Sequence, residues 1–231
     1  MRTHNTRRRK MKYGNAPELH GIWDLEFEQY MHYMYLPVEI PEDSRHWFTL
    51  PPELEFAREL IGYAWATEVS RGNLWSHVYV TARRGFATPG NPLNRPGWHS
   101  DGFGTPDINY VWTDRYPTEF AIGDFGTISE DHIKSTEQFT HRATWWPTVR
   151  VRTYEDKTLM RLDPSVIHTA PPIPAPGGER SFFKVSFSNT RYNLKGNAHN
   201  YMLKYDWPMY DRATVRNDPS RAQDDTVEEE K

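Results

Sequence analysis

The 231-residue chain contains no cysteine. Disulfides, thiolate catalysis and cysteine-bound zinc or iron–sulfur clusters are therefore excluded together. No apolar run is long enough for a transmembrane helix, so no membrane partner is expected. The basic N-terminus is not followed by an apolar segment, so we expect no secretory signal and a cytoplasmic location.

A large excess of charge of either sign is also lacking, since 28 Lys and Arg face 31 Asp and Glu. The net charge of −3 argues against wholesale nucleic-acid binding. Basic residues crowd the start and acidic residues the end, which predicts a basic arm (1–17), one domain (18–210) and an acidic, flexible tail (211–231). A basic arm that touches phosphate, or tails that contact a neighbouring subunit in a homo-oligomer, stay open.

Aromatic residues are abundant, with 9 Trp, 13 Tyr and 11 Phe, and 18 Pro are scattered along the chain. Both features favour a β-rich fold with many turns. Alternating or β-rich runs predict strands at 76–82, 108–113, 118–122, 148–154, 158–162 and 180–189. Many short antiparallel strands suggest a β-sandwich, barrel or jelly roll.

The N-terminal third combines a strand pattern with a helix pattern. Alternation from Trp23 to Tyr35 predicts one long or two short half-buried strands. Pro51-Pro52-Glu53 then opens a helix, because proline suits the first turn and an early glutamate complements the helix dipole. Its apolar stripe, from Leu54 to Ala64, is expected to pack outside the sheet. Residues 123–141 are polar and are not assigned to an element.

His99-Ser100-Asp101 is the only His-x-Asp in the sequence, and it lies between two predicted strands. In an extended segment, positions two apart point to the same face, so the imidazole and the carboxylate would point the same way. They form two members of the ligand set of non-haem Fe(II) oxygenases, two histidines and one carboxylate. The alternative is a turn in which Asp101-Gly102 caps a strand end. A single His-x-Asp is expected by chance in a sequence of this composition. The surrounding sequence must therefore decide between a metal site and a turn.

His168 has the context that suits a third ligand. It follows the predicted strand 158–162, the tight turn Asp163-Pro164-Ser165 and the start of another strand. After a proline-rich loop, Arg180 opens the last predicted strand. The alternatives are that His168 caps the turn, and that Arg180 pairs with Glu179 or lies on a solvated strand face.

The order of these features resembles that of the Fe(II)/2-oxoglutarate-dependent dioxygenases, especially the prolyl-4-hydroxylase-like branch. The resemblance covers about residues 76 to 190 and consists of four residues in ordered context. It implies a mainly β fold with flanking helices, a double-stranded β-helix (jelly roll) with the N-terminal helix packed outside. It further implies that His99, Asp101 and His168 are the catalytic iron ligands, and that Arg180 anchors the far carboxylate of 2-oxoglutarate.

The same resemblance points to further contacts with the co-substrate. Asn109 and Tyr110 begin the strand after the motif, where such positions often hydrogen-bond 2-oxoglutarate, although a core role is equally compatible. Lys184 shares the strand parity of Arg180 and is the alternative anchor. Three protein ligands would leave Fe(II) open to 2-oxoglutarate and O2. The expected reaction hydroxylates a substrate and releases succinate and CO2.

Two other functions compete with this hypothesis. One is a non-catalytic jelly roll that binds a ligand or builds an assembly. The other is a cupin-type metal enzyme without 2-oxoglutarate, although the His-x-His typical of cupins is absent from the sequence. The substrate is not identified by the sequence. The basic arm slightly favours a macromolecule over a small molecule.

Overall fold

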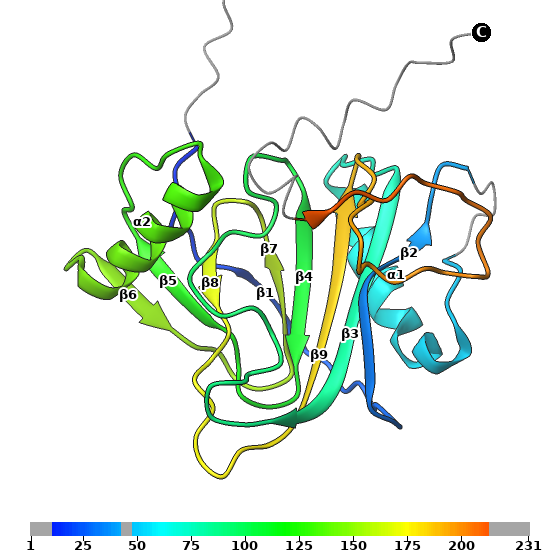
Figure 1. The fold of residues 1–231 in the computed structure, drawn as a ribbon, viewed down its shortest axis with the longest axis horizontal. Helices are drawn as coiled ribbons and strands as arrows, with labels where there is room; N and C mark the ends of the chain where they lie inside the picture. Colours follow the sequence, from blue (N-terminus) through cyan, green and yellow to red (C-terminus); the bar gives the residue numbers. More distant parts are fainter. Residues whose placement is uncertain (1–10, 43–47, 213–231) are drawn as a thin grey trace, which may run out of the picture.

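The computed structural model describes residues 11–42 and 48–212 (Figure 1). Within these residues, two β-sheets are flanked by helices. The elements in chain order are β1 (Glu18–Ile22), β2 (Met31–Glu39), the 3-10 helix η1 (Pro52–Ala57), α1 (Arg58–Ser70), β3 (His77–Ala87), β4 (Ile108–Thr113), β5 (Glu119–Gly123), α2 (His132–Trp145), β6 (Val149–Arg152), β7 (Thr158–Leu162), β8 (Ile167–Thr169) and β9 (Gly178–Ser188).

The strand order identifies the architecture. The larger sheet has the order β1-β7-β4-β9-β3-β2 and the smaller sheet β6-β5-β8, with antiparallel pairing in both. A bridge between His99 and His168 adds a fourth short segment to the smaller sheet beside β8. Four segments of this sheet face β7, β4, β9 and β3, which is the eight-segment arrangement of a jelly roll. The predicted jelly-roll fold is confirmed, and β1 and β2 extend the larger sheet at its two edges.

Apolar side chains between the two sheets hold them together. Phe120 of β5 packs with Val111 of β4, Met160 of β7 and Phe182 of β9, and all four are buried. These residues fill one end of the interior. Polar and charged side chains occupy the other part of the larger sheet's inner face, and the candidate site lies there.

The predicted N-terminal helix is confirmed. It begins as η1, directly after Pro51, and continues as α1. The predicted stripe of Leu54, Leu60 and Ala64 is fully buried against the outer face of the larger sheet, where α1 lies behind β3 and β9 (Figure 1). Because this helix covers the outer face, the inner face remains for the site.

One further prediction needs correction, and one unassigned segment gains a structure. The alternation from Trp23 predicted strand structure, but β2 begins only at Met31. The preceding aromatic residues Trp23 and Phe27 instead pack irregularly against the α1 cluster. The unassigned stretch 123–141 contains most of α2, whose N-terminus is capped because the Asp131 side chain accepts a hydrogen bond from the backbone N–H of Lys134.

Part of the predicted basic arm is packed onto the domain. The backbone N–H of Gly14 donates to the Ser165 carbonyl at 2.8 Å, and its carbonyl accepts from Gly123 at 2.9 Å. The Tyr13 ring contacts Phe139 of α2, at 5.1 Å between centroids. Tyr13 and Gly14 of the predicted arm are therefore held against β5, α2 and the turn before β8. Residues 1–10 of the arm and residues 213–231 of the predicted tail lie outside the described residues.

Within the described part of the chain, no helix combines the length and apolar character that crossing a bilayer requires.

A buried ion pair ties α1 to the sheet. The fully buried carboxylate of Glu68 accepts hydrogen bonds from Arg161 of β7 at 2.6 Å and from the Tyr110 hydroxyl of β4 at 2.8 Å. Asn73 donates to its other oxygen at 2.7 Å. Both carboxylate oxygens of Glu68 thus accept hydrogen bonds, which offset the cost of burying the negative charge.

Replacing Glu68 by leucine is expected to reduce the free energy of unfolding by about 3–5 kcal/mol, because the Arg161 guanidinium would stay buried without its partner. Urea unfolding measures this difference. Glu59→Leu, at an exposed position of the same helix, is the matched control and should change stability by less than about 0.5 kcal/mol. Equal effects of the two substitutions would show that the ion pair adds nothing.

The same cluster predicts a pH dependence of stability. Burial raises the pKa of Glu68, but Arg161, Asn73 and Tyr110 outweigh it, so the pKa lies below its ordinary value of 4.5. A carboxyl group with a lowered pKa stabilises the fold above its unfolded-state pKa, and this contribution is lost as the pH falls through the folded-state pKa. The stability difference between wild type and Glu68→Leu should therefore shrink below pH 4.5. A pH-independent difference, measured by urea unfolding, would contradict this.

Candidate metal centre and co-substrate cavity

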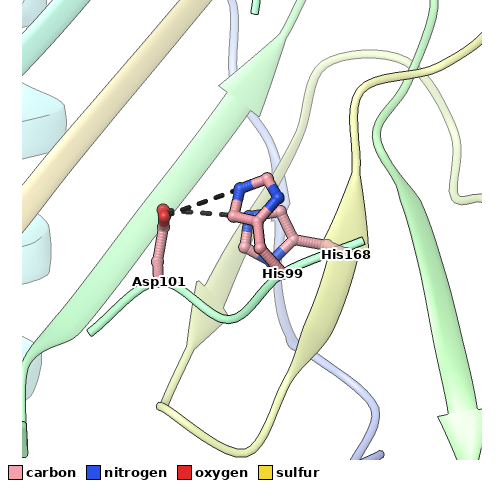
Figure 2. Close-up of side chains that lie close together, drawn as sticks. All are labelled: His99, Asp101 and His168. Atoms are coloured by element: carbon pink, nitrogen blue, oxygen red, sulfur yellow. Dashed lines mark ion pairs between the residues drawn. The ribbon is translucent and has the colours of Figure 1, made fainter. Parts of the chain in front are cut away.

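The three predicted ligands come together between the sheets (Figure 2). His99 lies in the segment between β3 and β4, and His168 lies in the middle of β8. Their backbones pair directly, with the N–H of His99 donating to the His168 carbonyl at 3.0 Å and the reverse bond at 2.9 Å. This bridge brings the two imidazole rings to 4.5 Å between centroids.

Asp101 completes the cluster from the turn that follows the bridge. Its carboxylate oxygens lie 3.8 Å from Nε2 of His99 and 3.8 Å from Nε2 of His168. One donor atom from each of the three residues lies within 4.8 Å of the others. The sequence suggested an extended segment from His99 to Asp101. In the structure, a turn begins at Asp101. Gly102 has a φ of +72° in this turn, and a side chain there would be strained.

The protonation states suit metal ligands. Burial lowers the pKa of His99, and burial together with the neighbouring His99 lowers the pKa of His168 to about 3. Burial raises the pKa of Asp101, but Lys184 and the two histidines outweigh it and hold the pKa well below its ordinary value. At neutral pH the cluster therefore consists of two neutral imidazoles and one carboxylate, the ligand set of non-haem Fe(II) centres.

The orientation of His99 is fixed by its second ring nitrogen. Nδ1 lies 2.7 Å from the Gly97 carbonyl oxygen, which can only accept a hydrogen bond. The proton therefore sits on Nδ1, and the lone pair of Nε2 points toward Asp101 and His168. A backbone acceptor of this kind sets the tautomer of metal-binding histidines in proteins.

Lys184 does not occupy the anchor position proposed for it as an alternative. Its buried ammonium group lies 2.8 Å from Oδ2 of Asp101 and donates to the Tyr35 hydroxyl at 3.2 Å. An ammonium that contacts a ligand carboxylate directly is too close to the cluster for the far end of a chelating dicarboxylate. It stabilises the ionised form of Asp101 instead, and the proximity raises the pKa of Lys184 despite its burial.

Arg180 lies deeper in the same cavity and is 1% exposed. Its guanidinium donates to the carbonyls of Tyr116 and Pro92, both at 3.1 Å, and to the side-chain oxygen of Asn94. Its Nη2 is buried and has no partner among the described residues. Burial lowers the pKa of Arg180 to about 10, so it stays charged at neutral pH. An unsatisfied buried guanidinium is suited to bind a carboxylate.

A cavity of about 190 Å³ connects the ligands and the guanidinium. It is lined by His32, Met34, Tyr35, Thr81, Arg83, Leu93, Asn94, Arg95, His99, Asp101, Thr118, His168, Ala170, Arg180, Phe182 and Lys184. The three-donor cluster and the unpartnered Nη2 atom together fit a divalent metal ion with a small dicarboxylate. Sequence reasoning missed Tyr35, Thr118 and Arg83, although the inward parity of Arg83 in β3 was a usable signal.

The two remaining predicted contacts do not line this cavity. Asn109 is buried and accepts a hydrogen bond from Ser186 at 2.6 Å, on the inner face but beyond Lys184. Tyr110 lies on the opposite face of β4, where its hydroxyl contacts Glu68. Adjacent strand residues point to opposite faces, so Tyr110 faces away from the cavity. Asn109 is on the inner face but outside the cavity lining, so its contact with the co-substrate stays a prediction.

The chain matches no protein-family model and no curated protein. Among solved structures, it is similar to a bsmA homolog from Methylobium petroleophilum, at 16% identity and a TM-score of 0.35, over 80% of this chain and 68% of that one. It is also similar to a full-length Neurospora crassa protein in complex with α-ketoglutarate, at 12% identity and a TM-score of 0.38, over 79% and 64%. HygX from Streptomyces hygroscopicus, with nickel and 2-oxoglutarate bound, matches at 11% identity and a TM-score of 0.36, over 80% and 83%. These scores are low, and the assignment of the fold rests on the strand order.

Proposed function

We propose that this protein is an Fe(II)- and 2-oxoglutarate-dependent dioxygenase that hydroxylates a substrate and releases succinate and CO2. One observation carries the proposal. A single cavity holds both the cluster of His99, Asp101 and His168 and a buried guanidinium with an unpartnered nitrogen. The first suits Fe(II), and the second suits the far carboxylate of 2-oxoglutarate.

Each residue has a defined role in this proposal. His99, Asp101 and His168 would hold the iron, which when bound supplies the chemistry of O2 reduction coupled to oxidative decarboxylation. Arg180 would bind the distal carboxylate as a planar bidentate pair. Lys184 keeps Asp101 ionised and oriented, and burial of the cluster limits access of water. Assignment to the prolyl-4-hydroxylase-like branch, the cytoplasmic location and a homo-oligomeric state remain predictions.

Co-substrate turnover tests the proposal. Protein purified without oxygen is supplied with Fe(II), 2-oxoglutarate and air, and succinate is quantified with and without pools of candidate substrates. We expect metal-dependent succinate formation, which the right pool stimulates, together with a product that is one oxygen atom heavier by mass spectrometry. Succinate formation that is independent of added metal would contradict the proposal.

A non-catalytic binding domain is the second candidate, and the position of Lys184 favours it. The ammonium group at 2.8 Å from Asp101 already supplies a positive charge to the carboxylate, as a metal ion would. Calorimetric titration with Mn(II), a redox-stable probe, separates the two functions. A binding domain would take up no metal at the cluster, whereas the dioxygenase would bind one ion in a manner that depends on His99.

A further inference from the structure

The cavity has a strong excess of positive charge. Among the described residues that line it, four are cationic, Arg83, Arg95, Arg180 and Lys184, whereas Asp101 is the one carboxylate. Lys184 is paired with Asp101, so these two charges cancel. After this cancellation, and without counting Arg95, the cavity lining still carries the two positive charges of Arg83 and Arg180.

Filling the proposed site does not remove this excess. A divalent metal ion adds two positive charges, and 2-oxoglutarate adds two negative ones. Arg180 would gain a carboxylate partner, and it also feels the charges of Asp114 and Asp156, neither of which lines the cavity. Arg83 would gain none. Arg83 is partly buried, and a partly desolvated cation without a counter-charge attracts an anion, so the loaded cavity still favours a further anion.

Arg83 occupies a central position on the inner face. In the pairing of β3 with β9, Arg83 lies opposite Phe182. Its two neighbours on the same face of β3 are opposite Lys184 and Arg180. Arg83 donates a hydrogen bond to the Leu93 carbonyl, and it forms no ion pair with a carboxylate among the described residues. Burial lowers its pKa. The guanidinium therefore lines the cavity without a carboxylate partner among residues 11–42 and 48–212.

His32 adds a second donor beside Arg83. The two residues are directly paired across β2 and β3, so their side chains share one face of the sheet, and both line the cavity. Burial and the charge of Arg83 lower the pKa of His32, so its imidazole is neutral at pH 7 and offers one N–H donor. A guanidinium next to a neutral imidazole suits a carboxylate or phosphate group.

We propose that the primary substrate is anionic, and that Arg83, assisted by His32, binds its carboxylate or phosphate group beside the metal cluster. This inference rests on the proposed function and adds the chemical class of the substrate. Arg83 is then a residue that determines specificity and not a part of the 2-oxoglutarate anchor.

The test uses two simple anions as probes. Protein loaded with Fe(II) and 2-oxoglutarate without oxygen is titrated calorimetrically with inorganic phosphate and, separately, with acetate, at constant ionic strength. We expect one of them to bind, and the tighter probe identifies phosphate or carboxylate as the group. Arg83→Met should weaken this binding by about 10- to 100-fold, as loss of a charged hydrogen bond does. Arg83→Lys keeps the charge but loses the planar fork of the guanidinium. Its affinity for the anion should lie between those of the wild type and Arg83→Met.

Matched controls make the result specific. Arg84→Met removes the adjacent guanidinium of β3, which pairs with Glu179 at 2.6 Å on the other face, and should leave anion binding unchanged. The affinity for 2-oxoglutarate should be unchanged in Arg83→Met. Circular dichroism verifies that each variant is folded.

Three results would overturn the inference. They are no binding of either anion to the wild type, equal binding to Arg83→Met, or a loss of 2-oxoglutarate affinity in Arg83→Met as large as that in Arg180→Met. Failure of the proposed function looks different. The protein would then bind neither Fe(II) nor 2-oxoglutarate, while the dependence of phosphate binding on Arg83 can still be measured without metal.

Discussion

Replacing His99 by alanine is expected to abolish metal binding and, with it, succinate formation. His99 supplies one of three donor atoms that lie within 4.8 Å of one another, and two remaining donors hold a divalent ion poorly. Loss of a hydrogen-bond partner of a ligand already costs about 10- to 100-fold in affinity or activity, so loss of the ligand itself should cost more. Calorimetry with Mn(II) and a succinate assay measure the two effects.

His141→Ala is the matched control, because His141 is exposed on α2 and lies outside the cavity lining. It should bind metal and form succinate as the wild type does. Asp101→Asn should reproduce the loss seen in His99→Ala, since the carboxylate would no longer supply its negative charge. Metal binding that survives in both His99→Ala and Asp101→Asn would show that the cluster is not the metal centre.

Arg180→Met is expected to weaken 2-oxoglutarate binding by about 30-fold or more, because truncating one partner of a buried charge pair costs roughly 2 kcal/mol or more. Metal binding should be unchanged, since Arg180 contacts none of the three ligands. The measurement is the dissociation constant of 2-oxoglutarate for protein that carries Mn(II). Arg180→Lys should recover part of the affinity, because it restores the charge without the planar fork.

Lys184→Met provides the decisive comparison. The contact of Lys184 with Asp101 predicts that its loss disturbs metal binding at least as much as 2-oxoglutarate binding. If Lys184→Met weakened 2-oxoglutarate selectively while Arg180→Met did not, the assignment of the anchor would be reversed. Thermal unfolding of both variants verifies that the loop around Pro92 and Asn94, which Arg180 holds, has not destabilised the fold.

Strands and helices with strong local patterns were predictable. β4 and β7 have the predicted bounds. In β4, β-branched and aromatic residues are concentrated between turn residues, and β7 ends at the turn Asp163-Pro164-Ser165. Patterns failed where tertiary packing decides. The aromatic run from Trp23 alternates like a strand but packs without pairing, and α2 buries only a narrow stripe that includes Phe139 and Ala143, so its sequence is largely polar.

The candidate site was partly predictable. The order of His99, Asp101, His168 and Arg180 along the chain pointed to one cavity, and the fold places all four in it. The contact of Lys184 with Asp101 depends on how β9 faces the turn after the bridge, which sequence spacing does not encode. Asn109 and Tyr110 do not both point toward the cavity, because neighbouring residues of one strand face opposite sides of the sheet.

The central claim is that the metal cluster and Arg180 together bind one molecule of 2-oxoglutarate. Its most direct measurement is a calorimetric titration of 2-oxoglutarate into the protein without oxygen, with and without Mn(II). We predict binding of one molecule per chain, tight only when the metal is present and weakened by Arg180→Met. Binding that is equally strong without metal, or no binding with metal present, would contradict the account.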